Sequence, residues 1–180
     1  MAAIIASLIG FLALLVGGYT AWVQRYTANI QLEQVRAQVW PYLAMGSNNG
    51  GGDYEIFFEN KGVGPAVVRS VQVFAKGRSV SGWDQMMKLL AFKPKERYAR
   101  SPLNGVVLSP GETRHWIRFQ NAADAVAFLT EWGRDKIQVR ICYSSSLGDD
   151  WLLVQGLGRP ERPRPVPGCP KISDSEQFHD

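Results

Sequence analysis

The chain has 180 residues, of which 46% are hydrophobic and 20% are charged, and its formal net charge at pH 7 is +4. This length allows one folded domain of about 100–150 residues plus an appendage, and it excludes a large multidomain enzyme. The charges are unevenly distributed, because no Asp, Glu, Lys or Arg side chain occurs before Arg25. The composition therefore predicts an apolar N-terminal segment followed by a charged, globular domain.

Residues 1–23 are predicted to form a transmembrane helix. The uncharged stretch 2–23 would span about 33 Å at about 1.5 Å per residue, enough to cross the core of a lipid bilayer. Tyr19 and Trp22 suit the membrane interface. A cleaved signal peptide is disfavoured because the segment has no basic side chain and no good cleavage site. A buried helix of a soluble protein is disfavoured because apolar residues cover every face.

The flanking charges predict the orientation of this span. Arg25 and Arg36 follow the apolar segment, and the positive-inside tendency therefore places the C-terminal domain in the cytoplasm. Glu33 offsets one of these charges, so a periplasmic domain stays open as the alternative. The two cysteines do not decide between them. A disulfide between Cys142 and Cys169 would indicate an oxidising compartment, whereas two free thiols would fit the cytoplasm.

One stripe of the predicted helix carries small residues and then glutamines. Small residues at three- or four-residue spacing permit close approach of a second helix, and the same register continues through a juxtamembrane helix over residues 24–40. The stripe predicts self-association into a homo-oligomer, with the glutamines forming hydrogen bonds or lining a wet path. The alternative is that Ala and Gly are simply common in membrane spans and that the glutamines are solvated. The stripe consists of Ala3, Ala6, Gly10, Ala13, Gly17, Gln24, Gln31 and Gln38.

From Trp40-Pro41 onward the pattern changes to short apolar runs separated by turn residues. Pro41 ends the helix, and alternation of apolar and polar residues is typical of half-buried strands. We predict a mainly β fold over residues 41–157, an antiparallel β-sandwich with two short helical insertions. The expected strands are 41–45, 54–59, 67–75, 106–108, 115–119, 137–143 and 151–155.

The helical insertions are expected at 81–92 and 122–132, the second capped by Asn121. The first is followed by a basic stretch, and residues 76–100 contain seven Lys or Arg against Asp84 and Glu96. An apolar helix beside basic residues can lie on anionic lipid headgroups. The sequence favours the alternative, a helix that covers one end of the sandwich beside a solvated loop. The candidate lipid-facing residues are Lys88, Lys93, Lys95, Arg97 and Arg100.

Three segments carry a resemblance to a known family. They are Asn60-Lys-Gly-Val-Gly-Pro-Ala-Val-Val68, Leu108-Ser-Pro-Gly-Glu112 and Ile141-Cys-Tyr-Ser-Ser-Ser-Leu-Gly148. Over residues 41–156 the chain resembles the immunoglobulin-like, CARDB-type sandwich domains of bacterial membrane and surface proteins. The motifs specify turns rather than chemistry. The resemblance implies an immunoglobulin-like fold with a general binding role in a single-pass protein of the bacterial inner membrane.

Residues 158–180 are predicted to be a Pro-rich, basic and partly disordered tail. Five of the ten prolines lie between Gly158 and Pro170, which favours polyproline II or a disordered path. The tail could dock on a partner or on anionic lipid; the alternative is a solvated strap around the sandwich. The acidic last nine residues are expected to be disordered.

The residues give little support for catalysis. His115 is the only histidine before the tail, and the sequence has no zinc-binding, nucleophile-elbow or Walker motif. We predict no catalytic residues, no metal site and no cofactor, and the modest charge argues against nucleic-acid binding. The predicted function is a non-catalytic, membrane-anchored interaction or sensing module that contacts the bilayer and a protein partner. The alternative is an oligomeric membrane effector or channel component.

Overall fold

The computed structural model describes residues 2–48, 54–132, 137–156 and 162–179. The chain divides into two units, Met1–Gln38 and Val39–Asp180. The first unit is a single helix and the second contains all the described strands. Each unit is described by itself below.

Helix α1 covers Ala2–Gln38, 37 residues. It contains one segment long and apolar enough to cross a membrane, and none of that segment is buried against the rest of the protein. The Thr20 and Thr27 hydroxyls donate to the carbonyls of Val16 and Val23, so their polar groups are satisfied inside the helix. A helix whose apolar side chains have no protein partner requires an apolar solvent, which indicates membrane anchoring.

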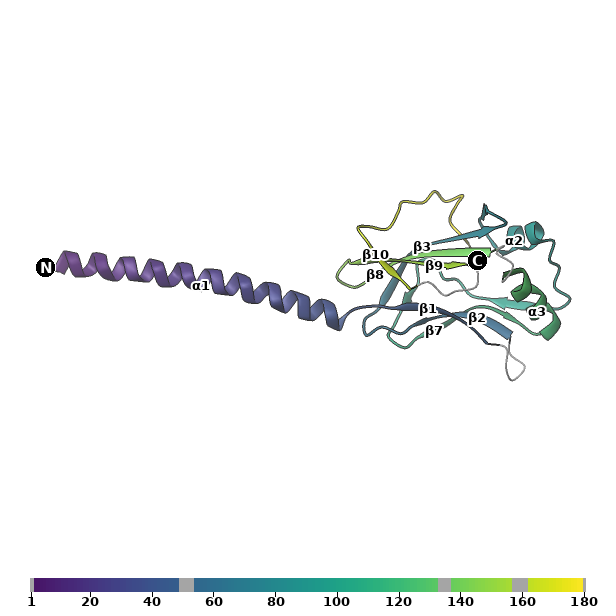
Figure 1. The fold of residues 1–180 in the computed structure, drawn as a ribbon, viewed down its shortest axis with the longest axis horizontal. Helices are drawn as coiled ribbons and strands as arrows, with labels where there is room; N and C mark the ends of the chain where they lie inside the picture. The colour runs from purple at the N-terminus through teal and green to yellow at the C-terminus, as the bar shows by residue number, and fades with distance from the viewer. Residues whose placement is uncertain (1, 49–53, 133–136, 157–161, 180) are drawn as a thin grey trace. The chain divides into compact units, whose positions relative to one another are not determined.

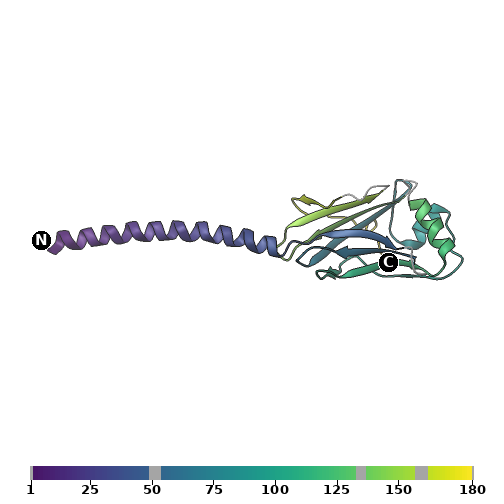
Figure 2. The same cartoon turned by 60° about the horizontal axis from the view of Figure 1, so that its bottom comes forward.

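The second unit contains two antiparallel sheets that face each other, consistent with a β-sandwich (Figures 1 and 2). The four-stranded sheet has the order β1-β2-β7-β5, with β1 Leu43–Asn48, β2 Tyr54–Asn60, β5 Tyr98–Arg100 and β7 Thr113–Phe119. The six-stranded sheet has the order β10-β9-β8-β3-β4, and β6 also pairs with β3. Its strands are β3 Ala66–Ala75, β4 Arg78–Val80, β6 Val107–Leu108, β8 Ile137–Ser144, β9 Asp150–Gly156 and β10 Arg164–Val166.

A cluster of aromatic side chains forms part of the buried core of the folded unit. Trp116 on β7 lies 4.6 Å from Trp83 and 5.5 Å from Phe178, measured between ring centroids, and all three side chains are buried. Phe128 extends the cluster on the side of Trp83. Large buried rings contribute much of the apolar area of a small core, so this cluster is a major source of stability.

Two short helices cover the same end of the sandwich (Figure 2). Helix α2, Trp83–Leu90, buries Trp83, Met86, Met87 and Leu90 at helical spacing, and it ends at Ala91 in the left-handed conformation. Helix α3, Ala122–Glu131, begins at Asn121, whose side chain accepts hydrogen bonds from the amides of Ala123 and Asp124. The cap predicted at Asn121 is confirmed. The apolar face of α2 packs on the core, so it does not face lipid.

The C-terminal segment forms a strap, defined as residues 162–179, along the six-stranded sheet. Its strand β10 pairs with β9, and Cys169 is bonded to Cys142 on β8. Farther along, the Phe178 amide donates to the carbonyl of Val71, which lies between the parts of β3 that pair with β6 and β4. The strap thus crosses from one edge of the sheet toward the other.

The strap differs from the disordered end that the acidic residues predict. Phe178 is only 1% exposed, and His179 forms a β-bridge with Gly82. The composition of the last nine residues is polar except for two apolar side chains, and the burial of one aromatic ring is enough to fix the segment. Residues 158–161 of the predicted tail lie outside the described residues.

Each of the seven predicted strands has a counterpart in the structure: β1, β2, β3, β6, β7, β8 and β9. The sequence did not predict the three-residue strands β4, β5 and β10. These segments read Arg-Ser-Val, Tyr-Ala-Arg and Arg-Pro-Val and contain no apolar run, unlike the segment 106–108 that was predicted, and each pairs with a longer neighbouring strand. Both predicted helices are present, with α2 shorter than the range 81–92.

Candidate functional site

The two ends of the folded unit have different chemistry. We call the end formed by the turns 39–42, 60–65, 109–112 and 145–149 the neck end, because the chain enters the unit there. We call the end that carries α2, α3 and the segment 91–97 the basic end. Strand β3 runs between them, from Ala66 to Ala75, which is about 30 Å at about 3.3 Å per residue. Figure 1 shows the two helices at the end of the sheets away from the start of β1.

Asn60 organises the neck end. Its side chain is fully buried, and its Oδ1 accepts hydrogen bonds from the amides of Tyr42 and Gly62. Its Nδ2 donates to the carbonyls of Gly64 and Leu108. One side-chain amide therefore joins the turns 39–42 and 60–65 to the end of β6, so the motif at Asn60 has a structural role.

The two glycines of this motif permit a close approach of backbones. A Cβ atom at Gly64 would lie 2.0 Å from the carbonyl oxygen of Val39, and one at Gly62 would lie 2.4 Å from that of Trp40. The amides of Val63 and Gly64 both donate to the Trp40 carbonyl. The Lys61–Pro65 turn thus fastens the first residues of the unit and has no feature of a phosphate-binding loop.

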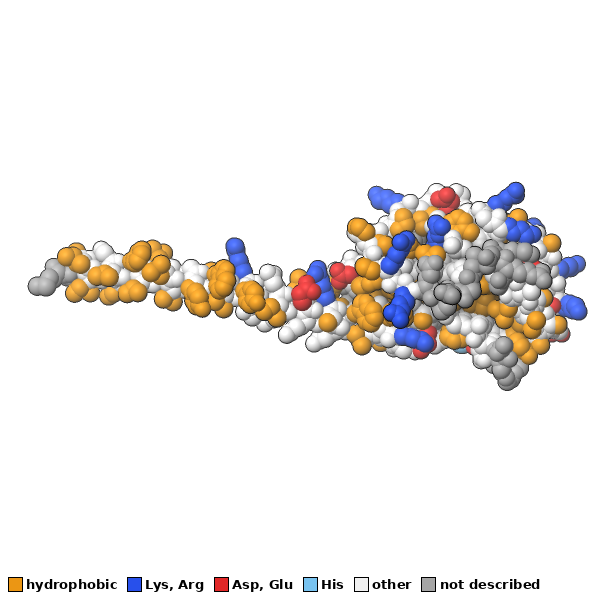
Figure 3. All heavy atoms as spheres, viewed as in Figure 1, with side chains coloured by type: hydrophobic (Ala, Val, Ile, Leu, Met, Phe, Trp, Pro, Cys, Tyr) orange, Lys and Arg blue, Asp and Glu red, His pale blue; other side chains and the backbone are white. Residues whose placement is uncertain are grey.

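The basic end brings the five candidate basic residues together. Lys88 lies on α2, Arg100 on β5, and the other three lie on the connecting segment. Figure 3 shows Lys and Arg side chains at this end of the folded unit and also elsewhere on the same face. Among the described residues one ion pair involves them, Arg100 with Asp84 at 3.9 Å, and both side chains are largely exposed. The others are Lys88, Lys93, Lys95 and Arg97, for which the described residues provide no acidic partner within 4 Å.

A buried carboxylate holds the basic segment in place. Asp124, in the first turn of α3, is 4% exposed, and its Oδ2 accepts hydrogen bonds from the amides of Lys95 and Glu96 at 2.7 and 3.0 Å. The Glu96 carboxylate in turn accepts a bond from Asn121. These bonds involve backbone amides. They therefore fix the backbone of Lys95 and Glu96 without occupying the lysine and arginine side chains of the segment.

Three shallow hollows open along the basic end, and Asp84 lies at the margin of each. One lies between α2 and β5, and its wall also contains Lys95, Glu96, Arg97, Tyr98 and Arg100. A second extends from Met87 and Lys88 to Phe92 and Lys93. A third lies over the start of α2 beside Arg100 and His179. Together they form a groove between α2 and β5, named here the basic groove.

The residues of the predicted association stripe all lie on α1. Ala3, Ala6, Ala13, Gln24, Gln31 and Gln38 are exposed, and no atom lies within 4 Å of a Cβ placed at Gly10 or Gly17. The stripe is therefore open to a second helix. Self-association stays a prediction.

His115 and Cys142 are not brought together. His115 is on β7 in the four-stranded sheet, where its Nδ1 lies 2.9 Å from Glu55, and Glu55 also pairs with Arg118 at 2.8 Å. Cys142 is on β8 in the other sheet and is bonded to Cys169. The arrangement excludes a thiolate–imidazole pair between these residues.

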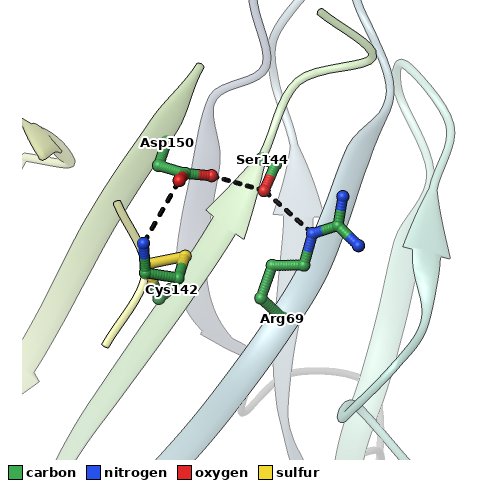
Figure 4. The surroundings of a disulfide bond; sticks show 5 residues. Arg69, Cys142, Ser144 and Asp150 are labelled. Atoms are coloured by element: carbon green, nitrogen blue, oxygen red, sulfur yellow. Dashed lines mark hydrogen bonds between the residues drawn. A yellow bond between two sulfur atoms is a disulfide. The ribbon is translucent and has the colours of Figure 1, made fainter. Parts of the chain in front are cut away.

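A polar chain surrounds the disulfide (Figure 4). Asp150 accepts hydrogen bonds from the Cys169 amide and the Ser144 hydroxyl, and Ser144 accepts one from Arg69. Cys142 and Ser144 are buried beneath the strap on β8. These bonds attach the strap to β8 and β9 independently of the sulfur atoms.

Tyr143 connects the two sheets near the neck end. Its hydroxyl accepts a hydrogen bond from the Leu43 amide on β1, while its ring lies in the core. Burial raises the pKa of Tyr143 well above its usual value because the phenolate would lose hydration, although the Leu43 amide acts in the opposite direction. The phenol is therefore a structural group that remains neutral.

Comparisons of this chain with protein-family models, with curated proteins and with solved structures find no match.

Sequence reasoning missed two groups at the basic end. Asp124 gave no signal because a carboxylate in the first helical turn is ordinary, and only the fold brings it to the backbone of Lys95. Tyr98 and the rest of β5 were missed because the segment Tyr-Ala-Arg contains no apolar run. The run of lysines and arginines itself was the signal that located the groove.

Proposed function

We propose that this protein is a non-catalytic, membrane-anchored module that presents an immunoglobulin-like domain for interaction or sensing. One observation carries the proposal: α1 is long, apolar and unburied, whereas Val39–Asp180 folds as a separate unit with a charged groove of its own. The helix supplies the anchor, and the folded unit supplies the binding surface.

The strand order supports the immunoglobulin-like assignment. Constant-type domains have strands A, B, E and D in one sheet and C, F and G in the other. If the longer pairing strands are lettered along the chain, the sheet order β1-β2-β7-β5 becomes A-B-E-D. In the other sheet the order β3-β8-β9 becomes C-F-G. The chain departs from antibody domains in its disulfide, which joins the strap to β8 rather than one sheet to the other.

The disulfide favours an oxidising compartment for the folded unit. Disulfides persist in secreted, periplasmic and surface domains and are rare in the cytoplasm, where thiols are kept reduced. This argument outweighs the weak charge bias of Arg25 and Arg36, which pointed to a cytoplasmic domain. We therefore place the proposed domain in the periplasm of a bacterial inner-membrane protein.

The topology is tested with reporters fused to the C-terminus. An alkaline phosphatase fusion is active only in an oxidising compartment, whereas a green fluorescent protein fusion exported in the unfolded state is dark. We expect an active phosphatase fusion in the membrane fraction and no maleimide-reactive thiol in the native chain. Two reactive thiols with a fluorescent fusion would contradict the periplasmic placement, and recovery of the full chain in the soluble fraction would contradict the anchor.

Self-association through α1 belongs to the same proposal. The exposed small-residue stripe supports it, because two such helices can approach closely in a bilayer. Gly10→Leu with Gly17→Leu should reduce the crosslinked oligomer in native membranes, while Leu12→Ala and Leu14→Ala off the stripe should not. An oligomer that conducts ions in planar bilayers would favour the second candidate, a channel component; an unchanged oligomer in the glycine variant would contradict the stripe.

A further inference from the structure

We propose that the basic groove binds an extended, acidic segment of a partner protein. This inference rests on the proposed function, and it names the class of partner. The groove lies between α2 and β5, and its cationic side chains come from both elements and from the segment that connects them. It is built from ordered backbone, since Asp124 fixes the amides of Lys95 and Glu96.

The charges of the groove specify the sign of the ligand. Lys93, Lys95 and Arg97 are exposed, and within the described part of the chain no carboxylate lies within ion-pair distance of them. Clustered cations without counter-charges produce a positive potential that attracts and orients an anionic partner. Two acidic side chains lie in the walls of the hollows. Asp84 lines all three and is paired with Arg100. Glu96 lines one of them, and its carboxylate accepts a hydrogen bond from Asn121, so five cationic side chains face two carboxylates that already have partners.

The shape and edges of the groove specify an extended ligand. β5 is the last strand of its sheet in the order β1-β2-β7-β5, so its outer edge has no strand neighbour among the described residues. An edge strand can accept the backbone of an extended peptide, and flanking pockets then select its side chains. Tyr98 and Phe92 are half-buried in the groove wall and add apolar contact area.

A lipid surface fits the same residues less well. Membrane-bound amphipathic helices turn an apolar face toward the acyl chains, but the apolar face of α2 is buried in the core. None of the exposed large hydrophobic residues that the structure describes in the folded unit lines the groove: Val126 is on α3 outside it, and the others are Trp40, Val63, Val107 and Leu147. In addition, a bilayer is flat on this scale, whereas the cations line hollows. The observations therefore favour a peptide segment over headgroups.

The test measures binding of the full chain, reconstituted in phosphatidylcholine nanodiscs without detergent, to a labelled peptide of about ten alternating Glu and Thr residues by fluorescence anisotropy. The comparison ligands are the same peptide with Gln in place of Glu, and vesicles of phosphatidylglycerol or phosphatidylcholine. We expect saturable binding of the Glu peptide alone that weakens as salt rises. Equal binding of the Gln peptide, or binding of phosphatidylglycerol vesicles without the Glu peptide, would overturn the proposal.

Matched variants locate the binding. Lys93→Glu, Lys95→Glu and Arg97→Glu together should weaken the Glu peptide at least tenfold without lowering the melting temperature. The control reverses three exposed cations on the strap, Arg162→Glu, Arg164→Glu and Lys171→Glu, and should change affinity less than twofold. Equal losses in both variants would mean a general charge effect and would overturn the groove. If the peptide fails to bind while membrane crosslinking still recovers a partner elsewhere on the folded unit, this inference falls and the proposed function stands.

Discussion

The neck end and the basic end of the folded unit are both built from turns and short elements. They differ in whether their polar and charged groups have partners within the described part of the chain. At the neck end Asn60 satisfies four backbone groups from two turns and the end of β6, and Gly64 lies so close to the Val39 backbone that no side chain would fit there. At the basic end the backbone is satisfied by Asp124, but exposed cations of the connecting segment have no described counter-charge. The turn at Asn60 therefore serves structure, whereas the exposed cations of the basic end form the surface to which we assign the proposed binding.

The strap links the two ends. It is attached by Cys169 near β8 and by Phe178 at the aromatic cluster below α2. Chemical or thermal unfolding of variants of the full chain measures how much the strap and the neck end each contribute to stability.

Phe178→Ala should have the largest effect. The ring is buried against Trp83 and Trp116, and removing a buried Phe costs about 3–5 kcal/mol of unfolding free energy. The neighbouring Gln177→Ala should change stability by less than about 0.5 kcal/mol. An unchanged unfolding midpoint for Phe178→Ala would mean that the strap is not part of the core.

Asn60→Ala should follow, with a loss of about 3 kcal/mol. The substitution leaves two amides and two carbonyls of the neck end without their partner, and buried unsatisfied groups are costly. Lys61→Ala is the control, since its side chain is exposed in the same turn. Similar stabilities for the two variants would contradict the structural role assigned to the motif.

Cys169→Ser should lower the unfolding free energy by about 2–3 kcal/mol, because the disulfide closes a loop between residues 27 apart. The double variant with Cys142→Ser should lose no more than the single one, and reductant should destabilise only the wild type. Phe178 and the Asp150 bonds should keep the strap folded, so protease cleavage should stay slow within 162–179. Rapid cleavage there would show that the disulfide alone holds the strap.

Tyr143→Phe tests the alkaline limit and should give the smallest effect near neutral pH. The pKa of Tyr143 is raised in the folded state, so its contribution is complete below about pH 10, the usual value, and falls as pH rises above it. The Phe variant should lose about 1 kcal/mol at pH 7 with the Leu43 hydrogen bond, and its stability should fall less steeply above pH 10. Parallel pH profiles would contradict the buried phenol.

The candidate site was only partly predictable. A run of lysines and arginines is visible in any sequence, so the five basic residues could be named. Their arrangement around a groove could not be predicted. It depends on the pairing of Tyr98–Arg100 with β7 and on a hydrogen bond between Asp124 and the amide of Glu96, which is 28 residues away in the sequence. Long-range contacts of this kind leave no local periodicity.

The sequence by itself determined the apolar N-terminal helix, seven of the ten described strands and both short helices of this protein. The length of an uncharged segment, the alternation of apolar and polar residues and the residue that caps a helix are local properties. Each can be recognised within one segment of the sequence. Only the tertiary structure decided the pairing of Cys142 with Cys169, the burial of Phe178 and the hub at Asn60. These depend on which segments meet in space, and an isolated Phe in an acidic tail carries no signal until the core has a position for it.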